Sequence, residues 1–312
     1  VREKYSKLLN DHNARKSEKK LIPLEEARKN RLVTSWRQEQ IPEPAEKGIR
    51  VFEEFDLSVL VKYIDWTFFF FAWKISGKYP AIFDDPVKGA EARKLFDDAR
   101  FWLREIIARK LIKANGVLGL FPAVSSGDDV LILNDTKTGF VKTVFSFLRN
   151  QEQKEKGVPN LCLADYVAPE SSGLTDWAGA FVVTAALSDD VIKNYGDDDY
   201  ASIMIRILSD RIAEAAAEYL HERVRKEYWG YAAGEELTTE ELLKSRYRGI
   251  RPAPGYPACP DHTEKRVIFD LLEAERNTGA GLTENFAMTP PAAVCAYVFS
   301  HPLSSYFNVG KI

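Results

Sequence analysis

An aspartate stands beside an aromatic run in the first quarter of the chain. Asp65 is followed by residues 66–73, which read WTFFFFAW. Most of these aromatic side chains are expected in the core, because each buries a large apolar area. An acid in such surroundings needs a partner, either the amino end of a helix or a cationic group. The residues alone favour a helix-capping role and leave a cation-binding role open.

A proline-rich segment carries an arginine that could bind a carboxylate. Residues 251–260 read RPAPGYPACP, with four prolines among ten residues. Proline fixes the backbone and removes amide donors, so this segment is predicted to be rigid and neither helix nor central strand. The guanidinium of Arg251 can donate two parallel hydrogen bonds to a carboxylate, and a rigid loop holds a small ligand at low entropic cost. A structural crossover without a ligand is the alternative.

Four acids recur at four-residue spacing in a helix predicted over residues 200–228. They are Asp210, Glu214, Glu218 and Glu222. This spacing makes them neighbours on one slowly drifting ridge, where like charges repel. The row indicates either a solvated face with local salt bridges or a face that meets a cationic ligand or a partner surface. His221, in the same helix, is interpreted as solvated or salt-bridged.

Two aromatic residues near the carboxyl end, Tyr306 and Phe307, either pack as a strand or stack on a flat ring such as adenine. Cys259 and His262 have a metal-ligand spacing, but a zinc site needs about four ligands and no second pair matches. We therefore predict no metal site. The chain also lacks the glycine-rich turn of dinucleotide-binding folds, the Walker loop and the serine elbow of hydrolases.

Composition places the chain among globular proteins. Of its 312 residues, 45% are hydrophobic and 29% are charged, which is ample for a core. The net charge of -3 argues against nucleic acid or an anionic membrane as the main partner. Three cysteines argue against a disulfide framework and favour a reducing cytosol. No apolar run has the roughly 20 residues of a membrane span, so we predict a cytoplasmic protein.

The elements that must position these residues are strands in groups and a few long helices. Helices are predicted within residues 1–32 and over 57–64, 88–110, 200–228 and 264–275, and strands over 116–121, 130–133, 140–148, 177–187 and 286–299. Grouped strands favour an α+β fold with antiparallel pairing over a doubly wound sheet.

The chain is predicted to have two parts. Residues 1–50 form an amino-terminal helical and linker segment that packs on the main domain, and residues 51–312 form that domain. The chain starts in a charged pattern and ends without a polar tail, so we expect it to be part of a longer polypeptide.

Several ordered motifs together resemble the activation domain of cobalamin-dependent methionine synthase. They are residues 63–67 (YIDWT) with 77–80 (GKYP), 220–225 (LHERVR) with 228–231 (YWGY), 249–265, 282–288 and 297–302. The resemblance covers nearly the whole chain. The sequence departs from many relatives at Phe68, where they have proline, at Cys295 and Ala296, where they have serine and glycine, and at Phe307, where some have tyrosine.

The resemblance implies a C-shaped α+β domain, with a twisted antiparallel sheet bordered by long helices. It also implies a shallow groove for S-adenosylmethionine on the inner face, where Asp65 pairs with the ligand's amino group and Arg251 holds its carboxylate. The other implied positions are Tyr256 and Ala258 along the site, Tyr306 and Phe307 at the nucleoside, Glu214 as a supporting carboxylate, and Asp210 at the interface with the cobalamin domain, where it receives the histidine released from cobalt.

The implied function is reactivation of methionine synthase, the 5-methyltetrahydrofolate–homocysteine methyltransferase. The domain would bind S-adenosylmethionine and position its methyl group for reductive methylation of cob(II)alamin, which a separate cobalamin-binding domain of the same polypeptide carries. A flavodoxin-like protein or another flavoprotein would supply the electron. The contribution is positioning, so no catalytic residue is predicted, and the isolated chain is expected to turn nothing over. The alternatives are a protein-docking module and a freestanding carboxylate-based enzyme.

Overall fold

The computed structural model describes residues 20–195 and 197–310. Of the range 1–32 in which a helix is expected, residues 1–19 lie outside them, and the described part contains a helix over Leu24–Lys29. At the centre is a six-stranded antiparallel sheet in which β1 pairs with β2 beside the order β4-β3-β2-β5-β8. Its strands are β1 (Gly48–Phe52), β2 (Ile112–Ser126), β3 (Asp129–Leu133), β4 (Val141–Ser146), β5 (Asp176–Leu187) and β8 (Ala293–Val298), and a separate small pair joins β6 (Gly281–Leu282) to β7 (Met288–Thr289).

Helices surround this sheet in the described part of the chain. They are α2 (Leu24–Lys29), α3 (Leu57–Leu60), α4 (Trp66–Ala72), α5 (Gly89–Ala108), α6 (Asp189–Tyr195), α7 (Asp199–Arg223), α8 (Thr239–Leu243), α9 (Glu264–Leu272) and α10 (Ala274–Thr278). None of these described helices combines the length and the apolar character needed to cross a bilayer.

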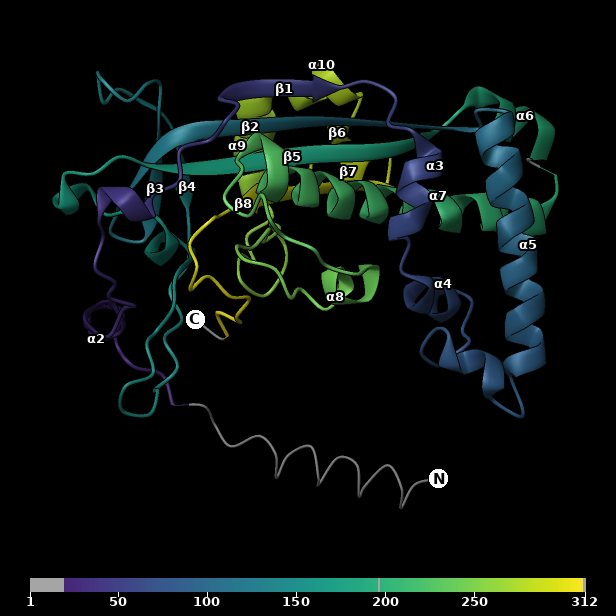
Figure 1. Cartoon of the computed structure of the whole chain (residues 1–312), viewed down its shortest axis with the longest axis horizontal. Helices are drawn as coiled ribbons and strands as arrows, with labels where there is room; N and C mark the ends of the chain where they lie inside the picture. The colour runs from purple at the N-terminus through teal and green to yellow at the C-terminus, as the bar shows by residue number, and fades with distance from the viewer. Residues whose placement is uncertain (1–19, 196, 311–312) are drawn as a thin grey trace.

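Strand β5 divides the hydrophobic core into two layers, because alternate side chains of a strand face opposite sides of the sheet. Phe181 and Val183 belong to the core cluster that includes residues of α7. Ala180 and Val182 belong to the cluster that includes residues of α9. Helix α7 therefore lies along one face of the sheet, and α9 with α10 covers the other (Figure 1).

The molecule has the C-shaped outline that the resemblance implied. In Figure 1 the sheet and α7 form a bar, helix α5 stands across one end of it, and α2 lies below the other end. The loops that follow α7 occupy part of the space between α2 and α5. The predicted α+β class with antiparallel pairing is confirmed.

Three predicted elements differ in detail. The helix predicted over residues 200–228 is confirmed, but its last turn, Val224–Tyr228, is π-helical. The helix predicted over residues 264–275 breaks at Glu273, whose φ of 47° ends α9 and starts α10 in a new direction. The strand predicted over residues 286–299 is interrupted between β7 and β8, where Pro290 and Pro291 cannot donate to a ladder.

The aromatic run of α4 is only half buried, which corrects the expectation that most of it is core. Phe69 and Phe70 are fully buried, but Phe68 and Phe71 are 58% and 69% exposed. The reason is that the run is a helix, which buries one stripe of its surface.

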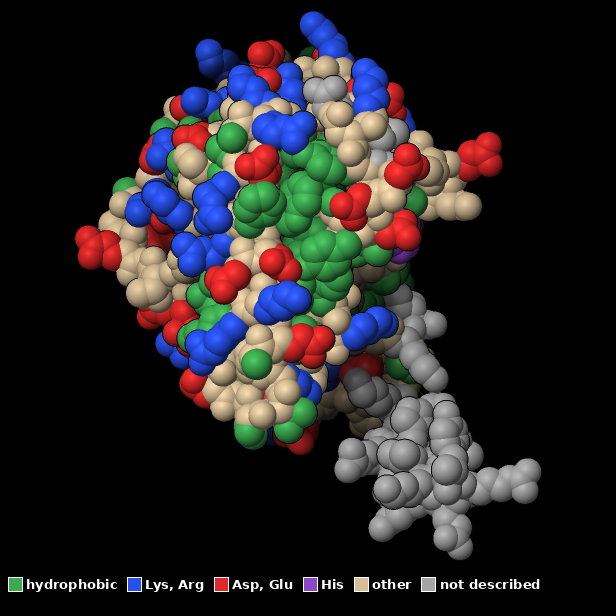
Figure 2. Space-filling model, turned by 90° about the vertical axis from the view of Figure 1, so that its right-hand side faces the viewer, with side chains coloured by type: hydrophobic (Ala, Val, Ile, Leu, Met, Phe, Trp, Pro, Cys, Tyr) green, Lys and Arg blue, Asp and Glu red, His purple; other side chains and the backbone are tan. Residues whose placement is uncertain are grey.

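Exposed apolar side chains also occur on α5 and at the start of α7. Phe101 and Tyr200 are exposed, and the Tyr200 hydroxyl donates to Asp98 of α5. The face that carries α5 has a band of hydrophobic side chains (Figure 2).

The turn before the proline-rich segment depends on Gly249, so Gly249→Ala is expected to destabilise the protein. Gly249 has a φ of +83°, and a Cβ there would lie 2.5 Å from the Tyr231 hydroxyl and 2.6 Å from the Phe299 carbonyl oxygen. We expect the free energy of unfolding to fall by about 2–4 kcal/mol, measured by urea denaturation. Gly279→Ala is the control, because Gly279 has a similar φ of +77° and open space around it. Equal losses in both variants would show that close packing at Gly249 is unimportant.

Candidate functional site

Asp65 is the amino-terminal cap of α4, as the residues alone favoured. Its Oδ1 accepts a hydrogen bond of 2.8 Å from the Thr67 amide. The side chain is partly exposed, and within the described residues no basic side chain forms an ion pair with it. Capping uses only Oδ1, so the carboxylate keeps acceptor capacity for a cation.

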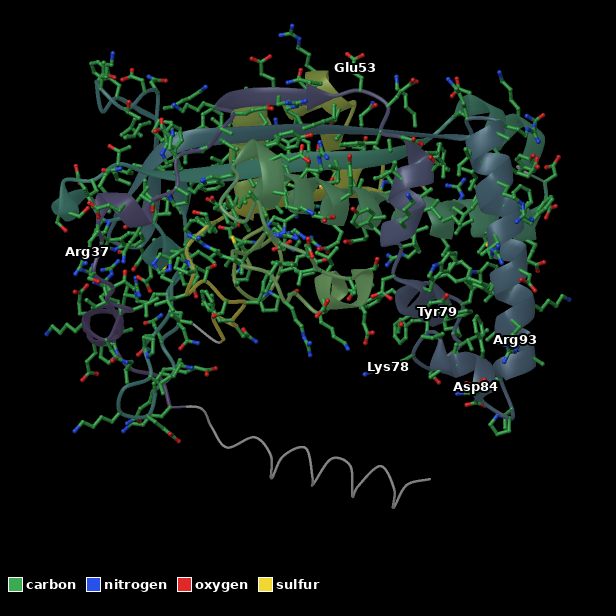
Figure 3. All side chains as sticks on the ribbon, viewed as in Figure 1. Arg37, Glu53, Lys78, Tyr79, Asp84 and Arg93 are labelled. Carbon is green, nitrogen blue, oxygen red and sulfur yellow. The ribbon has the colours of Figure 1, made fainter. Side chains whose placement is uncertain are left out.

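The motif at residues 77–80 packs against the first turn of α4, which Asp65 caps. The Tyr79 amide donates to the Thr67 hydroxyl over 3.2 Å, and the Tyr79 ring lies 5.6 Å from that of Phe96 on α5. In Figure 3, Lys78 points from the foot of this limb toward the middle of the molecule. The packing of Tyr79 thus fixes the start of the helix that Asp65 caps.

Arg251 is anchored at the start of the proline-rich segment. Its Nη2 donates to Oε2 of Glu218 over 2.6 Å, and its backbone amide donates to the Tyr306 hydroxyl over 3.0 Å. The side chain is 18% exposed. Burial opposes the charge, but the Glu218 carboxylate outweighs it, and the pKa of Arg251 is raised further above its ordinary value. The buried Nε has no hydrogen-bond partner among the described residues.

The residues around Asp65 and Arg251 itself contact helix α7. Residues before and after Asp65 in the chain contact this helix. The Tyr63 hydroxyl donates to Glu222 over 2.5 Å, and the Phe68 ring lies 6.0 Å from the Arg211 guanidinium. Arg251 contacts Glu218, which lies between these two positions. Residues 211, 218 and 222 fall within about 40° around a helix that turns about 100° per residue. Both ligand-binding candidates therefore approach one face of α7.

The acid row on α7 is not a uniformly solvated face. Glu218 is buried and paired with Arg251, and Glu222 accepts from Tyr63, so the interpretation of a solvated ridge with only local salt bridges is wrong. The segments that carry Tyr63 and Arg251 both pack on the ridge and cover these two acids. Asp210 is exposed and Glu214 partly so. Neighbouring groups desolvate Asp210 and raise its pKa, which Arg211 opposes.

His221 is fully buried, which corrects the prediction of a solvated or salt-bridged side chain. Its Nδ1 lies 2.9 Å from Nη1 of Arg225. Burial and the charges of Arg225 and Arg251 lower the pKa of His221 well below its ordinary range. The prediction failed because the neighbouring residues in the sequence are charged, which is typical of an exposed helix face.

The proline-rich loop is held by its own backbone. The Gly255 amide donates to the Cys259 carbonyl over 2.7 Å, and the Tyr297 amide donates to that of Pro252 over 2.9 Å. This leaves Tyr256 62% exposed, while Ala258 is 4% exposed. The segment is neither helix nor central strand, as predicted.

The two aromatic residues near the carboxyl end have separate surroundings. Tyr306 is 46% exposed, and its hydroxyl lies between the Arg251 amide and, at 3.3 Å, the Tyr247 hydroxyl. Phe307 instead packs against the core cluster of α9, with its ring 6.5 Å from that of Tyr166. Residues 299–310 form no strand, so the strand alternative is wrong.

A cavity lies close to these residues but does not include them. It has a volume of about 500 Å³ and lies between the segment with Trp36 and the loop with His301, with Arg248 in its wall. The rings of Trp36 and His301 are 4.8 Å apart. Burial lowers the pKa of His301 to about 4, so this ring is neutral at pH 7. Asp65 and Arg251 do not line this cavity, and both are partly exposed.

Some residues of the site were missed from the sequence. The Tyr247 hydroxyl lies 3.3 Å from that of Tyr306, and this contact spans 59 positions and has no local signal. Cys259 and His262 form no metal site: the described ranges contain no cluster of three or more histidine, cysteine or acidic residues that could hold an ion. The His262 Nδ1 lies 2.6 Å from the Lys265 ammonium instead.

Comparisons with known proteins show the family and the fold of the chain. Residues 56–312 match the family model described as the activation domain of vitamin B12 dependent methionine synthase. The chain is also similar to a crystal structure described as the MetH reactivation domain bound to AdoHcy, with 49% sequence identity and a TM-score of 0.90 over 94% of this chain and 90% of that one. The chain belongs to the family of activation domains of vitamin B12-dependent methionine synthases.

Proposed function

We propose that this chain binds S-adenosylmethionine and presents its methyl group to a cobalamin held by another domain. Asp65 pairs with the ligand's ammonium group, and Arg251 holds its carboxylate. Tyr256 and the backbone at Ala258 border the amino-acid tail. Tyr306 lies against the nucleoside, with Phe307 behind it, and Glu214 supports the site as a nearby carboxylate.

The observation that carries this proposal is that Tyr63, two residues before Asp65, and Arg251 both contact acids on one face of α7, although Asp65 and Arg251 are 186 positions apart in sequence. An amino-acid tail is a zwitterion, so one acid and one arginine match its two charges. The ion pair with Glu218 does not exhaust Arg251. A guanidinium has five N–H donors, and Glu218 accepts from Nη2 alone. The partnerless Nε is a further sign of unused donor capacity.

Reactivation places the remaining requirements on other domains. The cobalamin, carried by its own domain of the same cytosolic polypeptide, supplies the cobalt that receives the methyl group, and a flavodoxin-like or other flavoprotein supplies the electron. This chain's residues orient the sulfonium by gripping the tail and the nucleoside on either side of it. Asp210, exposed on α7, faces the docked cobalamin domain. Residues 51–312 form the binding domain, and the described residues 20–50 pack against it.

A freestanding carboxylate-based enzyme is less well supported. Such an enzyme needs an acid free to move a proton, but Glu218 is engaged by Arg251 and Glu222 by Tyr63. Asp210 and Glu214 have neither a histidine nor a nucleophile bonded to them among the described residues. A docking module that binds no ligand is also less well supported, because it does not explain why Asp65 and Arg251 match the two charges of an amino-acid tail.

Calorimetry of the 312-residue chain with S-adenosylmethionine tests the proposal. We expect saturable binding on the order of micromolar, because two charged contacts and one aromatic surface are available at an open site. We also expect no loss of the methyl group during incubation without cobalamin. No heat of binding, or methyl transfer by the chain alone, would contradict the proposed function.

A further inference from the structure

Arg251 and Tyr306 are joined into one contact group. The Arg251 guanidinium pairs with Glu218, and its backbone amide donates to the Tyr306 hydroxyl. The residue proposed to bind the carboxylate, Arg251, is thus hydrogen-bonded to the residue proposed to bind the nucleoside, Tyr306. A shift of one is transmitted directly to the other.

The same group continues through a second arginine. The Tyr306 hydroxyl lies 3.3 Å from that of Tyr247, and the Tyr247 ring lies 4.2 Å from the Arg225 guanidinium and 4.9 Å from the His221 ring. Arg225 is fully buried and makes two contacts with Glu235, of 2.6 Å from Nη2 and 3.0 Å from Nε. A planar guanidinium bound in this way has little freedom to move.

These contacts begin and end on α7, at Glu218 and His221, and the helix itself joins the two ends. Arg225 donates to Nδ1 of His221 over 2.9 Å, and His221 stands three residues after Glu218, which puts both on neighbouring positions of the helix surface. We call this set, Arg251, Glu218, His221, Arg225, Tyr247 and Tyr306, the α7 ring. Because an arginine has only donors, Nδ1 of His221 is the acceptor and its Nε2 carries the proton.

Three atoms of the α7 ring are buried without hydrogen-bond partners in the described structure. They are Oε1 of Glu218, Nε2 of His221 and Nε of Arg251. Buried polar atoms without partners are costly and uncommon, and each needs an explanation. One acceptor and two donors in this group therefore have no partner. We interpret them as part of a site preorganised for polar groups, which lowers the folding stability of the protein.

We propose that Glu218, supported by His221, Arg225 and Tyr247, is a positioning residue that makes the site prefer a ligand with an amino-acid tail over the same nucleoside without one. This inference rests on the proposed function. Glu218 acts through Arg251: its charge keeps the guanidinium turned toward the face of α7 that Asp65 shares. A neutral side chain of the same shape would leave Arg251 free to take other orientations.

The test compares two ligands on Glu218→Gln. S-adenosylhomocysteine carries the amino-acid tail, whereas 5′-methylthioadenosine has the nucleoside and sulfur without it. We expect calorimetry to give about tenfold weaker binding of S-adenosylhomocysteine to the variant, as for loss of one charged contact. Binding of 5′-methylthioadenosine is expected to stay within twofold. Glu227→Gln, at an exposed acid beyond the same helix, is the matched control and should change neither.

Tyr247→Phe gives an independent measurement if Glu218→Gln fails to fold. It removes only the hydroxyl that meets Tyr306 and keeps the ring over Arg225, so we expect both ligands to bind a few-fold more weakly. Equal losses of the two ligands in Glu218→Gln, or no loss of either, would overturn the positioning role. Failure of the unmodified chain to bind either ligand would instead contradict the proposed function itself.

Discussion

Arg251→Ala is expected to weaken S-adenosylmethionine binding by about a hundredfold, which corresponds to about 2.7 kcal/mol. The ligand carboxylate loses its guanidinium, and no other basic side chain is bonded to Glu218 in the described structure. The variant is also expected to unfold at lower temperature, because Glu218 would be left as a buried charge without a partner. Calorimetry measures the first effect and thermal denaturation the second.

A double variant separates these two effects. Glu218→Gln with Arg251→Met removes both buried charges, so we expect it to recover much of the lost stability. It should not recover the affinity, since the carboxylate still has no guanidinium. Binding as tight as that of the unmodified chain, in either variant, would show that Arg251 does not hold the tail.

Asp65→Asn is expected to weaken binding of the same ligand by between tenfold and a hundredfold, about 1.4–2.7 kcal/mol. The substitution removes the negative charge opposite the ammonium group. It preserves the cap of α4, because asparagine caps helices about as well as aspartate. The free energy of unfolding should therefore change by less than about 0.5 kcal/mol. Calorimetry and urea denaturation measure the two quantities on the same protein.

Asp56→Asn is the matched control for that experiment. Asp56 caps α3 in the same manner, with Oδ1 accepting from the Ser58 amide over 2.9 Å, and it forms no hydrogen bond or ion pair with a described residue of α7. We expect its affinity to be unchanged. If Asp65→Asn also leaves the affinity unchanged, the role of Asp65 is confined to capping.

Local signals in the sequence predicted the longest helices and the fold class, but not β1, α4 or α8. The cap at Asp65 and the absence of helix and central strand in residues 251–260 follow from short-range rules about side-chain acceptors and proline, and both are confirmed. The grouping of strands predicted antiparallel pairing, which the sheet confirms. These features depend on residues within a few positions of one another.

Contacts between distant segments could not be predicted in this way. Glu218 and Arg251 are 33 positions apart, and no rule of spacing pairs an acid in a helix with an arginine in a later loop. The burial of His221 has the same cause, since it depends on Tyr247 and Arg251 packing onto α7. The resemblance to a family supplied roles for Asp65 and Arg251 but did not reveal the α7 ring that connects Arg251 to Tyr306.

A crystal structure of this chain with S-adenosylmethionine tests the central claim most directly. We expect the ligand's carboxylate within about 3 Å of the Arg251 guanidinium, its ammonium nitrogen at the same distance from Asp65, and its adenine beside Tyr306. Ligand density at another surface, or a tail that points into solvent while Arg251 contacts only Glu218, would contradict it.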